Sequence, residues 1–197
     1  MGKQKYLEKV MHLFKESPVV SFRSIELIVK NKKNVKQYTK QFIRNLIKQK
    51  KIEKLTKGYY SSYGDPSLIV FCFKPSYLGM QNAMSFHNLW EQETNPVVVT
   101  SRNVRKGVRT VFGRNVFIQK IDKKYVFGFE YYKDGELYLP YSDIEKTFID
   151  MIYFKQYLDK ENILEFRKKI DKKKIKLYLE RYPEKFRKRV GRVLKGK

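Results

Sequence analysis

The segment KNVKQYTKQFIRNLIKQKK (residues 33–51) separates apolar from basic side chains with the period of an α-helix. The apolar residues recur at spacings that place them on one side of such a helix: Val35, Tyr38, Phe42 and Leu46. The opposite side collects polar and basic residues: Gln37, Lys40, Gln41, Arg44 and Lys48. A helix divided in this way packs on a small core with one face and presents the other to a polyanion.

The residues before this helix predict shorter elements. Ser17-Pro18 ends a first helix, and Ser21 or Ser24 can cap a second. The expected order is a helix over 3–16, a short strand at 19–20, a short helix through 29 and a polar turn over 31–34.

The residues after the basic helix predict a β-hairpin. In KIEKLTKGYYSS (residues 51–62), Ile52 and Leu55 alternate with polar residues, and Lys57-Gly58 has turn chemistry. Helix, strand, helix, turn, helix and hairpin is the element order of a winged helix-turn-helix domain. We therefore expect such a DNA-binding domain over residues 1–64.

The net charge of +24 comes from 44 Lys and Arg against 20 Asp and Glu, and it is concentrated at the two ends of the chain. Residues 1–64 hold 16 basic and 4 acidic residues, residues 65–140 hold 10 and 7, and residues 141–197 hold 18 and 9. Codon bias in an AT-rich genome would spread lysine evenly, so this distribution favours an anionic partner. Nucleic acid is the first candidate, ahead of a membrane surface or an acidic protein.

Length and composition indicate a folded protein without a membrane or disulfide signature. A chain of 197 residues, 42% of them hydrophobic, is long enough to bury one or two cores. No apolar run approaches the ~20 residues of a membrane span, and no signal peptide opens the chain. Cys72 is the only cysteine, which excludes an internal disulfide and a cysteine-based zinc site. We expect a cytoplasmic protein with no membrane partner.

Gly64-Asp65-Pro66 has the composition of a linker, so residues 65–197 are expected to form a second domain. The pattern there predicts a mixed antiparallel-sheet domain with C-terminal helices, which makes the whole chain α+β. Strands are expected over 68–73, 97–100, 108–112, 116–121, 125–132 and 137–141. Helices are expected over 77–90, 142–157, 162–169, 172–181 and 184–194.

The final segment, EKFRKRVGRVLKGK (residues 184–197), predicts a basic helix with one apolar face. We expect that face to dock the helix on the second domain through Phe186, Val190, Val193 and Leu194. Three partners stay open for its basic residues: more of the DNA, RNA, or an acidic protein.

Each polar residue of the basic helix and the hairpin has a candidate role on DNA. Lysine suits the neutralisation of phosphates, which we expect of Lys40, Lys48, Lys54 and Lys57. Amide and guanidinium groups can also bond base edges, which we expect of Gln37, Gln41 and Arg44. Lys36 suits either role, and Tyr59 suits backbone contact and packing equally. The alternative for the whole set is a solvated helix face, which the element order, the hairpin lysines and the scarcity of acids disfavour.

Signals of catalysis are poor. His12 lies among core-like residues and His87 beside Phe86, so each is expected to be structural. No nucleophile elbow, glycine-rich phosphate loop or Cys/His cluster occurs, and we expect no enzyme, cofactor or metal ion.

The best rival is YSDIEKTFID (residues 141–150), in which Asp143, Glu145 and Asp150 beside Lys146 suggest a Mg²⁺-dependent nuclease. On a predicted helix, however, Asp143 and Glu145 are acids of the first turn that complement the helix dipole. We therefore rank the nuclease below a DNA-binding regulator.

The sequence resembles the AbiEi antitoxin family of type IV toxin–antitoxin systems in three stretches. The matching order is KIEKLTKGYYSS, then SYLGMQNAMSFHNL (residues 76–89), then LPYSDIEKTFIDMIYF (residues 139–154). The resemblance implies a winged helix that binds inverted repeats in its own promoter and a C-terminal domain for antitoxicity and cooperative repression. It also implies a nucleotidyltransferase toxin as partner, although members without a toxin neighbour act as free-standing regulators. Inverted repeats lead us to expect a homodimer on DNA.

Overall fold

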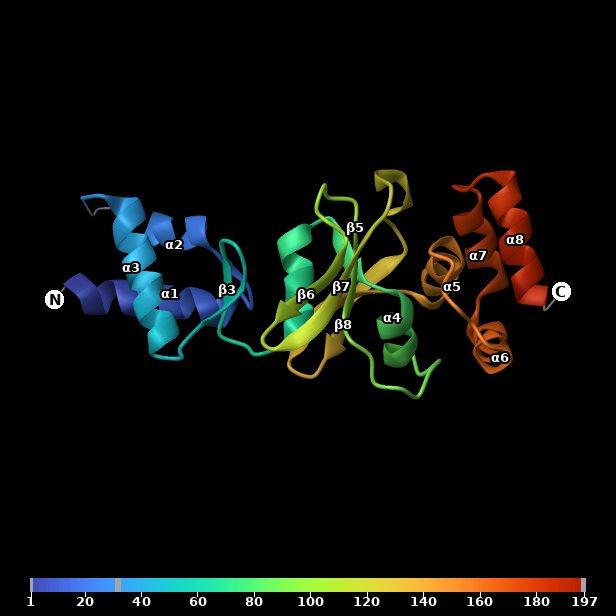
Figure 1. Cartoon of the computed structure of the whole chain (residues 1–197), viewed down its shortest axis with the longest axis horizontal. Helices are drawn as coiled ribbons and strands as arrows, with labels where there is room; N and C mark the ends of the chain where they lie inside the picture. Colours follow the sequence, from blue (N-terminus) through green and yellow to red (C-terminus); the bar gives the residue numbers. More distant parts are fainter. Residues whose placement is uncertain (1, 31–32, 196–197) are drawn as a thin grey trace. The chain divides into compact units, whose positions relative to one another are not determined.

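The computed structural model describes residues 2–30 and 33–195, which fall into two compact units (Figure 1). The first unit holds the residues up to Cys72 together with Thr110–Arg114, and the second holds Phe73–Arg109 and the residues from Asn115 on. The domain boundary expected at residue 64 stays a prediction. The α+β class is confirmed, with helices and a small sheet first, then a larger mixed sheet, then further helices.

The first unit is built from N-terminal helices and a small antiparallel sheet, shown in blue to cyan in Figure 1. Its helices are α1 (Gly2–Glu16), α2 (Phe22–Ile28) and α3 (Val35–Lys48). Its strands are β1 (Val20–Ser21), β2 (Glu53–Thr56) and β3 (Tyr59–Ser61), in the order β1-β3-β2. Local chemistry accounts for the boundaries, because Ser21 Oγ accepts a 3.0 Å hydrogen bond from Ser24 N at the start of α2.

The core of this unit corrects the expected apolar face of α3. The buried residues of α3 are Thr39, Ile43 and Leu46, whereas Val35, Tyr38 and Phe42 are only half-buried at its flank. Thr39 tolerates burial because its Oγ1 donates a 2.8 Å hydrogen bond to Val35 O. The helix is therefore rotated from the expected position, and its core partners come from every element around it: Val10, Phe14, Val20, Ile25 and Ile52.

The apolar run expected to be a strand over 68–73 is instead a 3-10 helix, η1 (Pro66–Phe73). Asp65 starts it, because Asp65 Oδ1 accepts a 2.8 Å bond from Ser67 N and its carbonyl accepts from Leu68 N. Leu68, Ile69 and Val70 are all fully buried. A short, continuous apolar run has no periodicity that separates a buried strand from a buried helix.

A six-stranded sheet has the order β6-β7-β5-β4-β9-β8 among the described residues, and it belongs to the second unit except for the part of β6 and β7 within Thr110–Arg114. The strands are β4 (Ser76–Leu78), β5 (Val97–Thr100), β6 (Gly107–Val111), β7 (Arg114–Lys120), β8 (Phe129–Asp134) and β9 (Leu137–Ser142). Pairs β4–β9 and β5–β7 are parallel, and pairs β4–β5 and β8–β9 are antiparallel. The expected antiparallel sheet is therefore only partly correct: β8 and β9 are antiparallel neighbours, but β5, β4 and β9 lie between β7 and β8.

Two further elements of this unit differ from expectation. The helix expected over 77–90 is shorter, because Tyr77 and Leu78 pair in the sheet and Gly79 separates them from α4 (Met80–Phe86). The strand expected from 125 begins later, because residues 123–125 form the short 3-10 helix η2 (Lys123–Tyr125).

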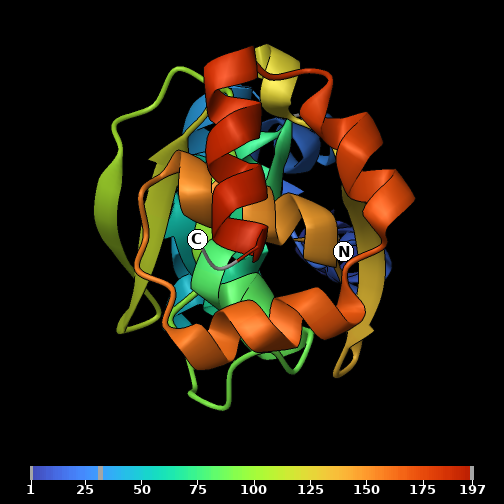
Figure 2. The same cartoon turned by 90° about the vertical axis from the view of Figure 1, so that its right-hand side faces the viewer.

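The C-terminal helices form where the sequence predicts them. They are α5 (Ile144–Tyr153), α6 (Lys160–Lys169), α7 (Lys172–Leu179) and α8 (Glu184–Lys195). Figure 2 shows α6, α7 and α8 in orange to red, grouped around α5. The docking of α8 by its apolar face is confirmed, with Val190 fully buried and Phe186, Val193 and Leu194 packed on the same core. Among the described residues, no helix is long and apolar enough to span a membrane.

Candidate nucleic-acid interface

One face of α3 carries all six of the predicted DNA-contacting residues of that helix, and every one of them is exposed. We call it the α3 face: Lys36, Gln37, Lys40, Gln41, Arg44 and Lys48. It lies opposite Thr39, Ile43 and Leu46, which fix the helix to the core. The buried side of the helix thus determines which side chains reach solvent. All six predicted residues are among those that do.

The hairpin of β2 and β3 carries the other predicted residues. Lys54 and Lys57 are exposed, whereas Tyr59 is half-buried, which leaves both of its expected roles open. The turn requires glycine, because Gly58 has φ +80°. Its carbonyl accepts a 2.8 Å hydrogen bond from Phe22 N, so the tip of the hairpin is tied to the start of α2.

The hairpin and α3 pack on the same core. In the described structure, their predicted DNA-contacting residues do not form hydrogen bonds or ion pairs with one another. Leu46 of α3, Ile52 before β2 and Tyr60 of β3 pack in the same cluster. Burial raises the pKa of the Tyr60 hydroxyl. Within residues 2–30 and 33–195, no hydrogen bond or ion pair joins the α3 face to Lys54 or Lys57. The two sets therefore belong to one unit and share its core.

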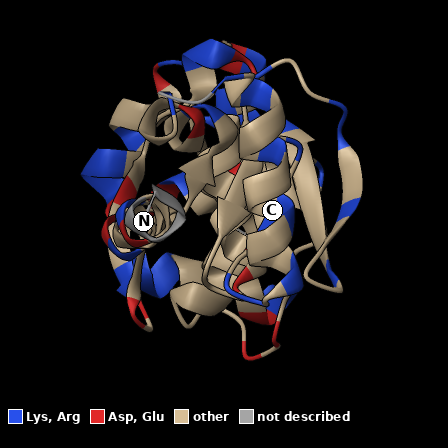
Figure 3. Ribbon diagram, turned by 90° about the vertical axis from the view of Figure 1, so that its left-hand side faces the viewer, with Lys and Arg blue, Asp and Glu red and all other residues tan. Residues whose placement is uncertain are grey.

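The charges of these surfaces are not neutralised within the protein. In the part of the chain that the structure describes, none of these lysines nor Arg44 makes an ion pair. The α3 sequence holds no Asp or Glu, and Figure 3 marks the basic residues of the unit in blue. Among the residues that the structure describes, the one side-chain hydrogen bond of the α3 face runs from Gln41 Nε2 to Asn45 Oδ1 at 3.2 Å. Unpaired cations held on a fixed helix attract phosphates, and a positioned amide can contact a base edge.

The carboxylates of the rival nuclease site are used inside the protein. Asp150 is fully buried, pairs with Lys146 and accepts a 2.6 Å bond from the Tyr77 hydroxyl. Burial raises the pKa of Asp150 and lowers the pKa of Lys146, and their mutual attraction offsets part of each shift. Lys146 Nζ also lies 3.3 Å from the Tyr182 hydroxyl.

The two other acids of that site join α5 to α7. Asp143 caps α5 through Lys146 N, and its Oδ2 accepts from the Tyr178 hydroxyl at 2.7 Å and pairs with Lys174 at 3.0 Å. Glu145 Oε1 accepts a 2.7 Å bond from Asp171 N. The expected first-turn positions are confirmed. In the described residues, no group of three or more His, Cys, Asp or Glu is arranged to hold a metal ion.

Sequence reasoning missed the partners of these acids. The Tyr77 hydroxyl reaches Asp150 across 73 residues of sequence, and the Tyr178 hydroxyl reaches Asp143 across 35. A tyrosine in an apolar segment gives no local sign that its hydroxyl meets a carboxylate, so only the tertiary fold reveals the contact.

The two histidines have different environments. His12 is exposed, so the expectation that it lies in a core is wrong. His87 is structural as expected, because its Nε2 lies 2.7 Å from Ser142 O and its ring contacts Phe86 and Tyr132. Burial lowers the pKa of His87.

Comparisons with known proteins add no family assignment. None of the family models searched matches the chain, and a search of curated proteins finds no match.

Proposed function

We propose that the protein is a sequence-specific regulator that binds double-stranded DNA, and that its first unit is a winged helix-turn-helix domain. The observation that carries this proposal is the α3 face, an exposed and unpaired basic surface on a helix whose other side is buried. The element order of α1, β1, α2, α3 and the β2–β3 hairpin supports it, since a winged domain has that order.

Within this proposal the α3 face enters the major groove and the hairpin acts as the wing. Gln37, Gln41 and Arg44 contact base edges, because an amide can pair with adenine and arginine with guanine. The contacts to phosphates come from the lysines Lys40, Lys48, Lys54 and Lys57. Lys36 lies in the first turn of the helix and serves phosphate or base, and Tyr59 adds a backbone contact.

We further propose that the regulator is an antitoxin of the AbiEi type that represses its own promoter. The resemblance of the three motifs supports this proposal, with cytoplasmic location, a homodimer on inverted repeats and a nucleotidyltransferase toxin as partner. A free-standing regulator is the alternative. Copurification of the untagged product of a neighbouring nucleotidyltransferase gene supports the antitoxin, and its absence at matched expression supports the free-standing form.

The proposal is tested by mobility shifts of DNA from upstream of the gene and of a scrambled duplex of equal length, over a series of salt concentrations. Gln41→Ala and Arg44→Ala are expected to reduce the preference for the promoter by roughly 1–3 kcal/mol each, since each removes a base contact. Lys54→Ala and Lys57→Ala are expected to weaken binding to both duplexes and to reduce the salt slope by about 0.9 each.

Lys173→Ala is the matched control, because Lys173 is exposed but lies on α7 of the second unit. It is expected to leave the promoter preference unchanged. Equal losses on both duplexes for Gln41→Ala, Arg44→Ala, Lys54→Ala and Lys57→Ala would disprove base recognition by α3. A wild-type protein that binds neither duplex at low salt would disprove the DNA-binding proposal itself.

A further inference from the structure

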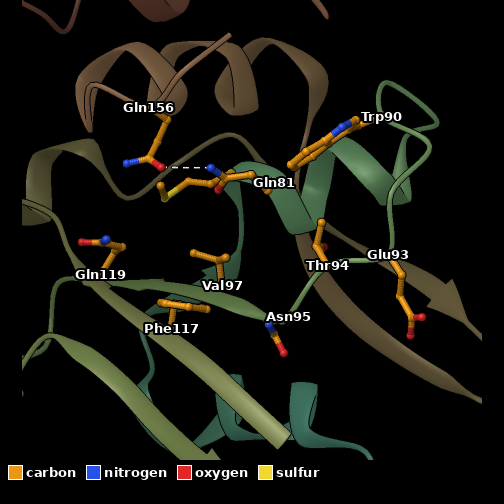
Figure 4. Close-up of a pocket in the computed structure, with 10 residues that line it drawn as sticks. Gln81, Trp90, Glu93, Thr94, Asn95, Val97, Phe117, Gln119 and Gln156 are labelled. Carbon is orange, nitrogen blue, oxygen red and sulfur yellow. Dashed lines mark hydrogen bonds between the residues drawn. The ribbon is translucent and has the colours of Figure 1, made fainter. Parts of the chain in front are cut away.

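The second unit contains a cavity of about 330 Å³ that the proposed DNA contacts do not use (Figure 4). It lies between the first residues of α4, the segment before β5, strands β5 and β7, and the residue Gln156 after α5. The lining residues are Met80, Gln81, Trp90, Glu93, Thr94, Asn95, Val97, Phe117, Gln119 and Gln156. All of them belong to the second unit, so the cavity is a feature of that unit alone.

The floor of the cavity is apolar and follows from the sheet register. Val97 of β5 and Phe117 of β7 are direct partners in the parallel pair. Successive side chains of a strand alternate between faces, so Gln119 lies on the same face as Phe117. Met80 completes the floor and is buried, whereas the Phe117 ring is 37% exposed. The cavity therefore offers a flat aromatic surface with an amide at its edge.

The walls carry amide groups, one of which is held in a fixed orientation. Gln156 Oε1 accepts a 2.9 Å bond from Gln81 Nε2, and Gln156 Nε2 donates to Phe154 O at 3.2 Å. This contact is the dashed line in Figure 4. Asn95 and Gln119 supply further amides. Asn95 and Gln119 each present a donor and an acceptor side by side, which suits a ligand with both on one edge.

A strained backbone residue lines the cavity. Met80 has φ +57°, a backbone conformation that a residue with a side chain rarely adopts. Backbone strain of this kind is concentrated at ligand-binding sites.

The charge of the lining excludes a phosphate group as the recognised feature. The chain has 44 Lys and Arg, yet none of the residues that line the cavity is basic. The one charged lining residue, Glu93, is exposed at the rim and would repel an anion. The lining therefore disfavours an anionic ligand, and it offers aromatic rings and amide groups for recognition.

We propose that this cavity is a binding site for an uncharged nucleoside with a purine base, such as adenosine. The base would stack on Phe117 or Trp90, as unpaired bases do on aromatic side chains. Glutamine and asparagine amides pair bidentately with the N6/N7 edge of adenine, which matches the walls. The volume lies at the lower end of the range of small-molecule sites, which suits a nucleoside better than a larger cofactor.

Trp90 provides a direct assay, because it lines the cavity and is the only tryptophan of the chain. Titration of the full chain with adenosine is expected to change Trp90 fluorescence with saturation, at a half-point below about 1 mM. Adenosine 5′-monophosphate is expected to bind more weakly than adenosine, because no basic side chain lines the cavity. No saturable signal with adenosine, or tighter binding of the monophosphate or of glucose, overturns the proposal.

Variants separate ligand recognition from structure. Gln119→Ala is expected to weaken adenosine binding about tenfold, whereas Asn115→Ala, on the same face of β7 but outside the lining, leaves it unchanged. Equal affinities for all of these proteins would overturn the proposed recognition. None of these measurements uses DNA, so they fail or succeed independently of the proposed DNA binding.

Discussion

The helices α3 and α5 both carry charged side chains, but those of α3 are exposed and those of α5 are buried. On α3 the lysines and Arg44 are exposed, and the described residues offer them no ion pair. On α5, Lys146 and Asp150 are fully buried and paired with each other, four residues apart. The comparison shows that a charge on a helix is available to a partner only when the surrounding fold leaves it unpaired.

The environments explain the difference. The α3 helix buries only Thr39, Ile43 and Leu46 completely, and its polar face is exposed to solvent. The α5 helix is covered by the sheet and by the C-terminal helices, and even its charged residues lie inside. A buried ion pair adds little net stability over an apolar pair, but removal of one partner leaves the other charge without compensation.

The largest expected effect comes from breaking that pair. Lys146→Met leaves Asp150 buried and unpaired, and it is expected to destabilise the second unit by about 3–5 kcal/mol. The same substitution on α3, Lys40→Met, is expected to change the free energy of unfolding by less than about 0.5 kcal/mol, because Lys40 is exposed and makes no ion pair in the described structure. Urea unfolding measures the two changes in stability. Trp90 fluorescence reports on the second unit, and circular dichroism reports on both units.

A compensated variant distinguishes the lost pair from a simple packing defect. Replacing Lys146 by Met, Asp150 by Leu and Tyr77 by Phe removes both charges and the hydroxyl that bonds Asp150. It is expected to recover most of the stability that Lys146→Met loses. If Lys146→Met unfolds at the same urea concentration as Lys40→Met, the contrast between the two helices is wrong.

The same two helices show how far the sequence could be interpreted. The period of α3 and the caps of the C-terminal helices are local signals, so these elements were predictable. The rotation of α3 toward Thr39 was not, because a threonine enters a core only when its hydroxyl finds a backbone acceptor. The burial of Lys146 was not predictable either, since its partners Tyr77 and Tyr182 come from distant segments.

Sheet order and the candidate cavity depended entirely on tertiary structure. Most strands were identifiable, apart from β4, which was expected to be helical, but the position of β4 and β5 in the middle of the sheet has no local signal. The cavity combines residues from 80 to 156, and its amides carry no motif. By contrast, the α3 face was identified in full, because all of its residues lie within four turns of one helix.

A smaller effect is expected when charge is removed from α8, whose basic residues are exposed like those of α3. Arg187→Ala/Arg192→Ala is expected to weaken binding to promoter and scrambled DNA alike, by less than about 1 kcal/mol. The preference between the two duplexes is expected to stay unchanged, because α8 is docked by its apolar face and serves only as a source of charge. Mobility shifts at two salt concentrations measure this, and a loss of preference as large as that of Arg44→Ala would place α8 in base recognition.

The smallest effect concerns a titratable group beside α5. Burial lowers the pKa of His87 below its ordinary value of 6.5, and nearby Lys169, whose Nζ donates to His87 O at 2.9 Å, lowers it further. The unfolded chain therefore binds a proton at His87 more readily than the folded protein does. The contribution of neutral His87 to the free energy of unfolding is complete above about pH 6.5 and is lost as the pH falls below that value.

Replacement of His87 by glutamine, which can still donate to Ser142 O, is expected to flatten the pH dependence of the urea midpoint, measured by Trp90 fluorescence. The exposed His12, changed to Gln, is the matched control and is expected to leave that dependence intact. A slope that His87→Gln leaves unaltered would assign the acid sensitivity to the carboxylates around α5 instead.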